Sequence, residues 1–165
     1  MKTLVLGLGN PILTDDGVGV RVADSVRQAL PPDSQVELCE VSIGGLMLME
    51  RMLGYDRVIL VDAFYPGNGK PGSFRRLTLE DMRAATPTHH SVSAHDTSLI
   101  AALEMGEHMG LPLPPEIIIY AVCVENIVDF SDQPTPAVAQ AIPQVTAAVL
   151  GELVTSGTVR EQLLR

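Results

Sequence analysis

Residues 3–30 read TLVLGLGNPILTDDGVGVRVADSVRQAL, and this stretch sets the architecture expected for the whole chain. Thr3–Leu8 is a short apolar run that ends in a Gly-Leu-Gly turn, which is typical of a buried strand. Val18–Leu30 then carries apolar side chains at helical spacing, and Pro31-Pro32 stops the helix. The stretch therefore predicts a strand, a polar loop and a helix in succession.

The same alternation of strand and helix patterns continues along the chain. Further strands are expected at Val36–Val41, Arg57–Asp62, Ser73–Leu79 (an edge strand) and Glu116–Val124, and further helices at Gly44–Leu53, Asp96–Gly110 and Pro136–Val154. Pro143 should kink the last helix. The pattern predicts one domain, residues 1–165, folded as a three-layer α/β/α sandwich with a mostly parallel sheet of about five strands.

Composition narrows the classes of partner. The formal net charge is −9, with 11 basic residues against 20 acidic ones, which argues against nucleic-acid binding. The N-terminus is typical of a first strand and not of a signal peptide, and no apolar run approaches the length of a membrane span. We therefore expect a cytoplasmic protein without a membrane partner, and a monomer as the default state.

Two cysteines, Cys39 and Cys123, each lie inside an apolar strand pattern. We predict that both are buried, reduced thiols. They are too few for a disulfide framework or a cysteine-rich zinc site.

Ligands of such folds bind beyond the carboxyl ends of the strands. That rule selects the loops Gly9–Gly19, Asp62–Gly69 and Glu125–Gln133. The first of these belongs to the motif G-L-G-N-P-I-L-T-D-D-G-V-G, for which three explanations compete.

Two of these explanations fit the motif poorly. A dinucleotide fingerprint would need a third glycine where Ile12 stands, and Asp15 and Asp16 would repel a pyrophosphate. Peptidyl-tRNA hydrolases open with a similar G-L-G-N-P stretch, but they continue with a histidine-containing segment, and this chain has no histidine before His89.

The third explanation accounts for the whole motif, which resembles the signature of the hydrogenase maturation proteases. Further landmarks of that family follow in order: Asp62 in V-D-A, His95 in S-A-H-D-T-S-L, and Thr135-Pro136 before the last helix. The resemblance extends from Lys2 to about Leu150.

The resemblance implies an endopeptidase that removes the C-terminal extension of a nickel-loaded [NiFe] hydrogenase large-subunit precursor. It assigns catalytic and metal-binding roles to Asp16, Asp62 and His95, with His90 as an alternative to His95. Two carboxylates and an imidazole form an oxygen–oxygen–nitrogen set that suits a divalent metal with open positions. Nickel is expected to arrive with the substrate, and zinc or cadmium could occupy the site in vitro.

Simpler roles exist for the same residues. Asp16 could cap the helix that starts near Gly17, and Asp62 could form an Asx turn. Asp15 is expected to be a cap or a supporting residue, and His108 to be solvated or to satisfy the helix end.

Two questions about the function stay open from the sequence. Either a metal activates water or a carboxylate of Asp16 or Asp62 acts as general base, as in an aspartic-type peptidase. A non-enzymatic nickel-sensing assembly factor or metallochaperone would use the same three residues. Val124-Glu125-Asn126 stands where many relatives carry a proline, which leaves the class of hydrogenase undecided.

Overall fold

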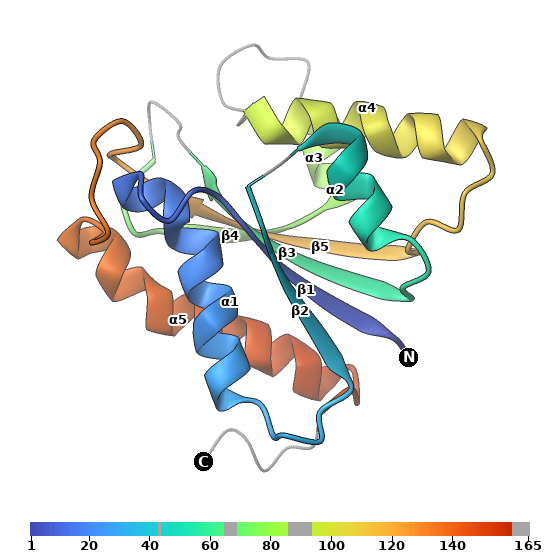
Figure 1. Ribbon diagram of the computed structural model, residues 1–165, viewed down its shortest axis with the longest axis horizontal. Coiled ribbons are helices and arrows are strands. Elements are labelled where there is room, and N and C mark those ends of the chain that lie inside the picture. The colour runs from blue at the N-terminus through green and yellow to red at the C-terminus, as the bar shows by residue number, and fades with distance from the viewer. Residues whose placement is uncertain (43, 65–68, 86–93, 160–165) are drawn as a thin grey trace.

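A computed structural model describes residues 1–42, 44–64, 69–85 and 94–159 of the chain. Five strands form one sheet in the order β2-β1-β3-β5-β4. The strands are β1 (Thr3–Leu8), β2 (Val36–Val41), β3 (Arg57–Phe64), β4 (Phe74–Thr78) and β5 (Glu116–Cys123). All neighbours pair in parallel except β4, which runs antiparallel to β5 at the edge. The predicted three-layer fold with a mostly parallel sheet of about five strands is confirmed (Figure 1).

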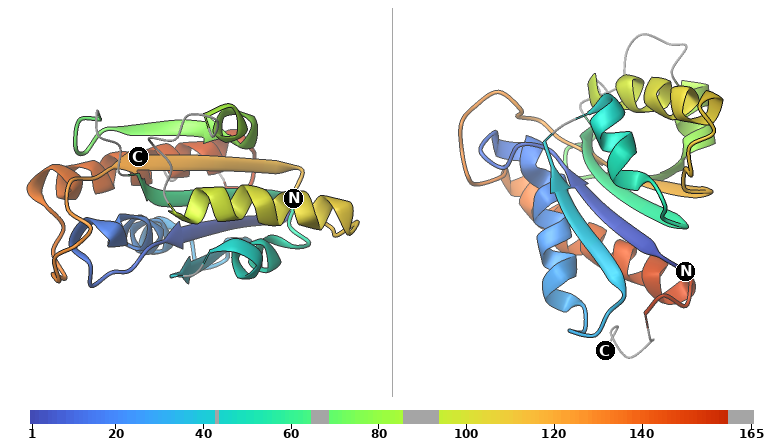
Figure 2. Two further views of the ribbon diagram at one scale, coloured as in Figure 1. Left: turned by 90° about the horizontal axis from the view of Figure 1, so that it is seen from above. Right: turned by 45° about the vertical axis from the view of Figure 1, so that its right-hand side comes forward.

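Helices cover both faces of this sheet (Figures 1 and 2). The helical elements are η1 (Thr14–Gly17, a 3-10 turn), α1 (Val18–Ala29), α2 (Gly45–Met52), α3 (Leu79–Ala85), α4 (Ala94–His108) and α5 (Pro136–Thr155). α1 and α5 lie on one face, and α2, α3 and α4 lie on the other. Each of the predicted helices is present within a few residues of its expected bounds, and α3 is an addition.

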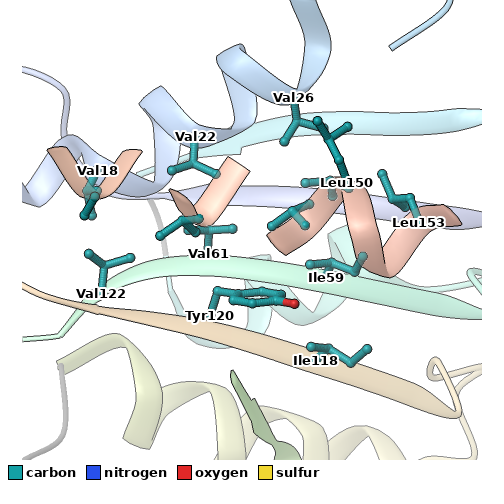
Figure 3. Packing of buried hydrophobic residues seen from close by; sticks show 14 of the residues in the cluster. Val18, Val22, Val26, Ile59, Val61, Ile118, Tyr120, Val122, Leu150 and Leu153 are labelled. Carbon is teal, nitrogen blue, oxygen red and sulfur yellow. The ribbon is translucent and has the colours of Figure 1, made fainter. Parts of the chain in front are cut away.

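The core consists of two aliphatic layers, one on each side of the sheet. On the first face, Val18, Val22 and Val26 of α1 meet Val61 of β3 and Leu150 of α5 (Figure 3). On the second face, buried leucines and methionines of α2 and α4 pack against the leucines of β1 and β3. β3 is buried along seven of its eight residues, as expected for a central strand that is covered on both faces.

The two cysteines differ in burial because their strands occupy different positions in the sheet. Cys123 lies in β5 and is buried, but Cys39 lies in β2, where it is half-buried. β2 has a single neighbour in the sheet, so its side chains are less completely covered. The prediction that both thiols are buried is therefore right for Cys123 and wrong for Cys39.

α5 also departs from the expectation that no apolar run reaches membrane-spanning length. Among the described helices, it alone is long and apolar enough to cross a membrane, with a mean hydropathy of 1.4. Yet Val138, Val145 and Val149 pack into the core against α1 and the sheet. Near its end, Glu152 forms ion pairs with Arg57 and Arg76 of the sheet. These contacts identify α5 as a core helix.

Candidate functional site

The order of the strands selects one place at the carboxyl edge of the sheet. The chain leaves β1 through α1 to reach β2 on one side, and then crosses through α2 to β3 on the other side of β1. The direction of the connections therefore reverses between β1 and β3. In open α/β sheets the crevice for a ligand lies at such a reversal, outside the carboxyl ends of the strands. Asp16 and Asp62 belong to the segments that surround it.

Asp62 faces the helical layer formed by α2 and α4. Its neighbours Val61 and Ala63 pack on the α1/α5 face, whereas Val58 and Leu60 pack on the α2/α4 face. Because side chains alternate along a strand, the side chain of Asp62 projects to the second face. It is only 3% exposed, and its Oδ1 accepts the backbone N–H of Ala63 at 2.8 Å. Burial of a carboxylate in an apolar layer is costly unless hydrogen bonds or a cation accompany it.

The position of Asp62 also corrects one detail of the sequence prediction. We expected this residue to end the third strand, but β3 continues through Phe64. The extra residues pair with β5, since Ala63 lies opposite Val122 and Phe64 lies opposite Cys123. Asp62 is thus part of the sheet, which fixes its backbone more firmly than a loop would.

Asp16 lies in η1, which follows β1 directly and contacts β3. Its Oδ2 accepts the backbone N–H of Asn10 at 2.7 Å. The expected alternative, capping of α1, is not what the structure shows: the cap position is Gly17, and no side-chain hydrogen bond is made there. The carboxylate instead orients the loop that surrounds it.

Gly9 allows the backbone of this loop to adopt its conformation. Its φ is +126°, and a Cβ added there would lie 1.8 Å from the carbonyl oxygen of Asp16. Only glycine tolerates both the backbone conformation and the contact. Asn10 completes the turn, because its Oδ1 accepts the N–H of Ile12 at 3.2 Å. The side chain of Asn10 thus helps to fix the loop.

Asp15 is the fully buried member of the acidic pair, with 0% of its surface exposed. Its carboxylate accepts the backbone N–H groups of Glu125, Asn126 and Thr135, and also the hydroxyl of Thr135. The donors belong to the loop after β5 and to the start of α5. Asp15 therefore connects the loop after β1 with the loop after β5 and supports Asp16 beside it, in line with the supporting role expected for it.

The structure describes the side chain of His108 and the backbone of His95. His95 is the second residue of α4, and the helix runs back over the sheet so that it begins at the end where the parallel strands finish (Figure 1). The side chain of His95 lies outside the described part of the structure, as do residues His89 and His90. His108, in the last turn of α4, contacts the carbonyl oxygen of Glu104 through Nδ1 at 2.7 Å. That contact agrees with the helix-end role expected for it.

A divalent metal such as nickel or zinc needs several nitrogen, oxygen or sulfur donors that converge on one point. Within the part of the chain whose side chains are described, no group of three or more His, Cys, Asp and Glu side chains is gathered tightly enough to hold a metal ion. Asp16 and Asp62 each accept one backbone N–H, which orients the carboxylate in the way that outer-shell contacts orient metal ligands. An imidazole at the start of α4 would add the nitrogen donor. The three residue types together fit a borderline divalent cation such as nickel or zinc.

The sequence did not predict the hydrogen bonds between Asp15 and Thr135, which join two loops at the carboxyl edge of the sheet. Thr135 precedes α5 and would ordinarily cap it, yet its hydroxyl donates to Asp15 at 3.0 Å. The two residues are 120 positions apart, so no local pattern joins them. The sequence offered only an indirect indication. Asp15 and Asp16 are adjacent, and a ligand role at Asp16 leaves Asp15 free for a structural role.

Comparison with known proteins agrees with this architecture. A sequence profile described as "Hydrogenase maturation protease" matches residues 20–152. The hydrogenase 2 maturation protease of Escherichia coli K12 is 29% identical over 157 residues, which cover 95% of this chain and 93% of that protein.

Solved structures show the same likeness. The hydrogenase-maturating endopeptidase HybD from E. coli superposes with a TM-score of 0.80 at 30% identity, covering 95% of this chain and 94% of that one. The [NiFe] hydrogenase maturation protease HybD from Thermococcus kodakarensis, at 22% identity and a TM-score of 0.70, shares the fold over 93% of this chain and 99% of its own. With a profile match over most of its length and these relatives, the chain belongs to the hydrogenase maturation protease family.

Proposed function

We propose that the protein is an endopeptidase that removes the C-terminal extension of a nickel-loaded [NiFe] hydrogenase large-subunit precursor, in the cytoplasm. Membership of the hydrogenase maturation protease family supports the activity and the class of substrate. The observation that carries the proposal is the placement of Asp16 and Asp62. Asp16 lies in the turn η1 that follows β1, and Asp62 lies near the end of the neighbouring strand β3, at the reversal of the sheet; each carboxylate accepts a backbone N–H.

In the proposed mechanism the precursor brings the nickel. Asp16, Asp62 and His95 bind the nickel of the substrate as oxygen and nitrogen ligands, and this binding places the scissile peptide bond beside the carboxylates. The protein itself carries no permanent metal. Since nickel is then part of the recognised substrate, a precursor that lacks it is not cut.

The two acids differ in burial and in the element that carries them, which suits them to different roles. Asp62 is buried within a strand, which suits a fixed ligand. Asp16 is half-buried in a 3-10 turn, closer to solvent, which suits a carboxylate that takes a proton from water as the water oxygen attacks the scissile carbonyl carbon, and returns it to the leaving amine as the C–N bond breaks. The bond between Asn10 N–H and Oδ2 keeps the carboxylate of Asp16 oriented during that transfer.

A cleavage assay tests the proposal. The purified protein is incubated with nickel-loaded and nickel-free precursor, and loss of the tail is followed by mass spectrometry. Wild type is expected to cut only the nickel-loaded precursor. Asp16→Asn, Asp62→Asn and His95→Ala should each lower the rate by about 100-fold or more, because each removes a ligand or a proton acceptor.

Matched controls come from the same structure. His108→Ala removes an imidazole at the far end of α4, and Asp33→Asn removes an exposed acid from the connection between α1 and β2, at the opposite edge of the sheet. Both should cut at the wild-type rate. A wild type that forms a nickel-dependent complex but never cuts would replace the peptidase with a nickel-sensing assembly factor.

A further inference from the structure

An exposed apolar surface lies next to the candidate site, on the two loops that Asp15 connects. We call it the loop patch and define it as Ile12, Val128 and Phe130, whose exposed fractions are 54%, 77% and 81%. The loop after β1 (blue) and the loop after β5 (orange) run side by side at the carboxyl end of the sheet in Figures 1 and 2. An exposed phenylalanine beside other apolar side chains is typical of a surface that binds a partner.

Backbone contacts hold the two halves of the patch together. Leu13 and Ser131 form a parallel bridge, in which Ser131 N–H donates to the carbonyl of Ile12 and Thr14 N–H donates to the carbonyl of Ser131. The register of this bridge places Ile12 beside Phe130. Two segments that are more than a hundred residues apart in the chain thus present one apolar surface.

Side-chain hydrogen bonds to backbone groups also stabilise the loops after β1 and β5. Thr14 Oγ1 donates to the carbonyl of Asp129 at 2.6 Å, and Arg21 donates to the carbonyls of Pro11 and Asp132. Asn126 Oδ1 accepts the N–H groups of Val128 and Asp129 and so holds the turn that carries Val128. A surface fixed in this way loses little conformational entropy when a partner binds.

The charged side chains that flank Phe130 in the loop are acidic, and the nearby Arg21 is half-buried and donates to the carbonyls of Pro11 and Asp132. Asp129 and Asp132 flank Phe130 and are exposed, and the whole chain has a net charge of −9. Since like charges repel, the surface selects a partner segment that combines apolar side chains with lysine or arginine. The patch includes Ile12 of the loop that carries Asp16, so a segment bound there would lie close to the carboxylates.

From these contacts we infer that the loop patch is the docking surface for an apolar, lysine- or arginine-flanked segment of the large-subunit precursor, outside the residues that bind nickel. This inference rests on the proposed function, because the proposed substrate supplies the partner. Phe130 is its central residue, being the largest and most exposed of the three side chains. Docking at the patch sets the affinity for the precursor, and the carboxylates set the rate of cutting.

The test compares Phe130→Ser and Ile12→Ser with Met105→Ser and Met109→Ser. The two methionines are 51% and 65% exposed; Met105 lies in the last turn of α4 and Met109 directly follows the helix, at the end opposite to His95. Cleavage of nickel-loaded precursor is measured over a range of concentrations, and binding is measured separately by biolayer interferometry. Phe130→Ser should raise KM and Kd about tenfold or more and leave kcat within about twofold. The methionine variants should match wild type.

Further arms separate the outcomes. Asp132→Asn should raise KM by about twofold and weaken the dependence of binding on salt, as expected for a cationic partner segment. A Phe130→Ser variant with wild-type Kd overturns the docking surface, as does a wild type that self-associates through Phe130. A wild type that binds the precursor without cutting it removes the peptidase activity, while the ratio of Kd values still decides the role of the patch. A wild type that neither binds nor cuts overturns both proposals.

Discussion

Asp15 accepts both the backbone N–H and the side-chain hydroxyl of Thr135, at 2.7 and 3.0 Å, across 120 residues of sequence. The same carboxylate accepts the N–H groups of Glu125 and Asn126. One buried side chain therefore satisfies backbone donors of a loop that forms no regular ladder. The neighbouring acid, Asp16, therefore lies in a loop that is anchored to residues 125–135 through Asp15.

Asp15→Ala should lower the free energy of unfolding by about 2–4 kcal/mol, because partly buried donors would lose their shared acceptor. Urea denaturation followed by circular dichroism measures the change. Asp132→Asn, at an exposed acid of the same loop, serves as the control and should change stability by less than about 0.5 kcal/mol. Equal stability of the two variants would contradict the role given to Asp15.

The close approach of α1 to the sheet gives a second prediction. A Cβ added at Gly19 would lie 2.2 Å from the carbonyl oxygen of Val61 and 2.4 Å from that of Leu8. Both atoms belong to strands, so they cannot move aside as a side chain would. Gly19→Ala should therefore destabilise the protein by about 3 kcal/mol, at the upper end of overpacking effects.

Gly151 of α5 is the matched control for that substitution. Nothing lies within 4 Å of a Cβ built there. Gly151→Ala should raise stability by about 0.5–1 kcal/mol, because alanine favours the helix over the unfolded chain. Thermal unfolding of the two variants should move in opposite directions. A Gly19→Ala variant with the Tm of wild type would contradict the close contact between α1 and the strands β1 and β3 at this residue.

Strong local patterns made most of the fold predictable. The apolar run RVILVD predicted a central strand, which the structure extends by two residues, and the helical spacing of Val18, Val22 and Val26 matches the face that α1 buries. The missed helix, α3, also carried a signal. Thr78 and Asp81 form a capping box, in which Thr78 N–H donates to Asp81 and Asp81 N–H donates to the Thr78 hydroxyl. The Thr-x-x-Asp spacing is visible in the sequence.

What the sequence could not predict depends on where elements meet. The half-buried state of Cys39 follows from the edge position of β2, which is a property of the strand order. The four bonds to Asp15 join segments that only the folded chain brings together. Family resemblance supplied Asp16 and Asp62 as candidates, but the reversal of connections between β1 and β3 is what explains their location.

Thiol labelling gives a third prediction, which follows from the two cysteine environments. Cys39 is half-buried on the edge strand, whereas Cys123 is 5% exposed and its pKa is raised by burial. Because the thiolate is the reactive form, Cys123 should react far more slowly with iodoacetamide at pH 8. Mass spectrometry of the native protein should show one modified cysteine, Cys39, before the second. Cys39→Ser should abolish the fast phase, and labelling of Cys123 at the same rate would contradict the burial of β5.

The ion cluster at the end of α5 gives a prediction about pH. Glu152 is 15% exposed at its side chain and accepts hydrogen bonds from Arg57, Arg76 and Tyr120. The hydrogen bond from Arg76 is the largest cause that holds the pKa of Glu152 below its usual value of 4.5. Burial of the phenol, with a further contribution from Glu152, raises the pKa of Tyr120 to about 12.

The sign of the effect follows from the depressed pKa of Glu152. Its stabilising contribution is complete above pH 4.5, where the carboxylate is ionised in both the folded and the unfolded chain. As the pH falls below that value, the unfolded chain takes up the proton first, and the contribution is lost as the pH passes through the lower pKa of the folded state. Glu152→Gln should therefore cost about 2 kcal/mol at pH 7 and progressively less on acidification below pH 4.5.

Urea denaturation of wild type and Glu152→Gln at pH 7, 5 and 4 measures this convergence. Glu50→Gln, at an exposed acid of α2, is the control and should differ from wild type by less than about 0.5 kcal/mol at every pH. A difference between Glu152→Gln and wild type that stays constant down to pH 4 would mean that shape, and not charge, holds α5 on the sheet. If the stability of wild type approaches that of Glu152→Gln as the pH falls, the ion pairs of Glu152 with Arg57 and Arg76 are contacts that acid weakens.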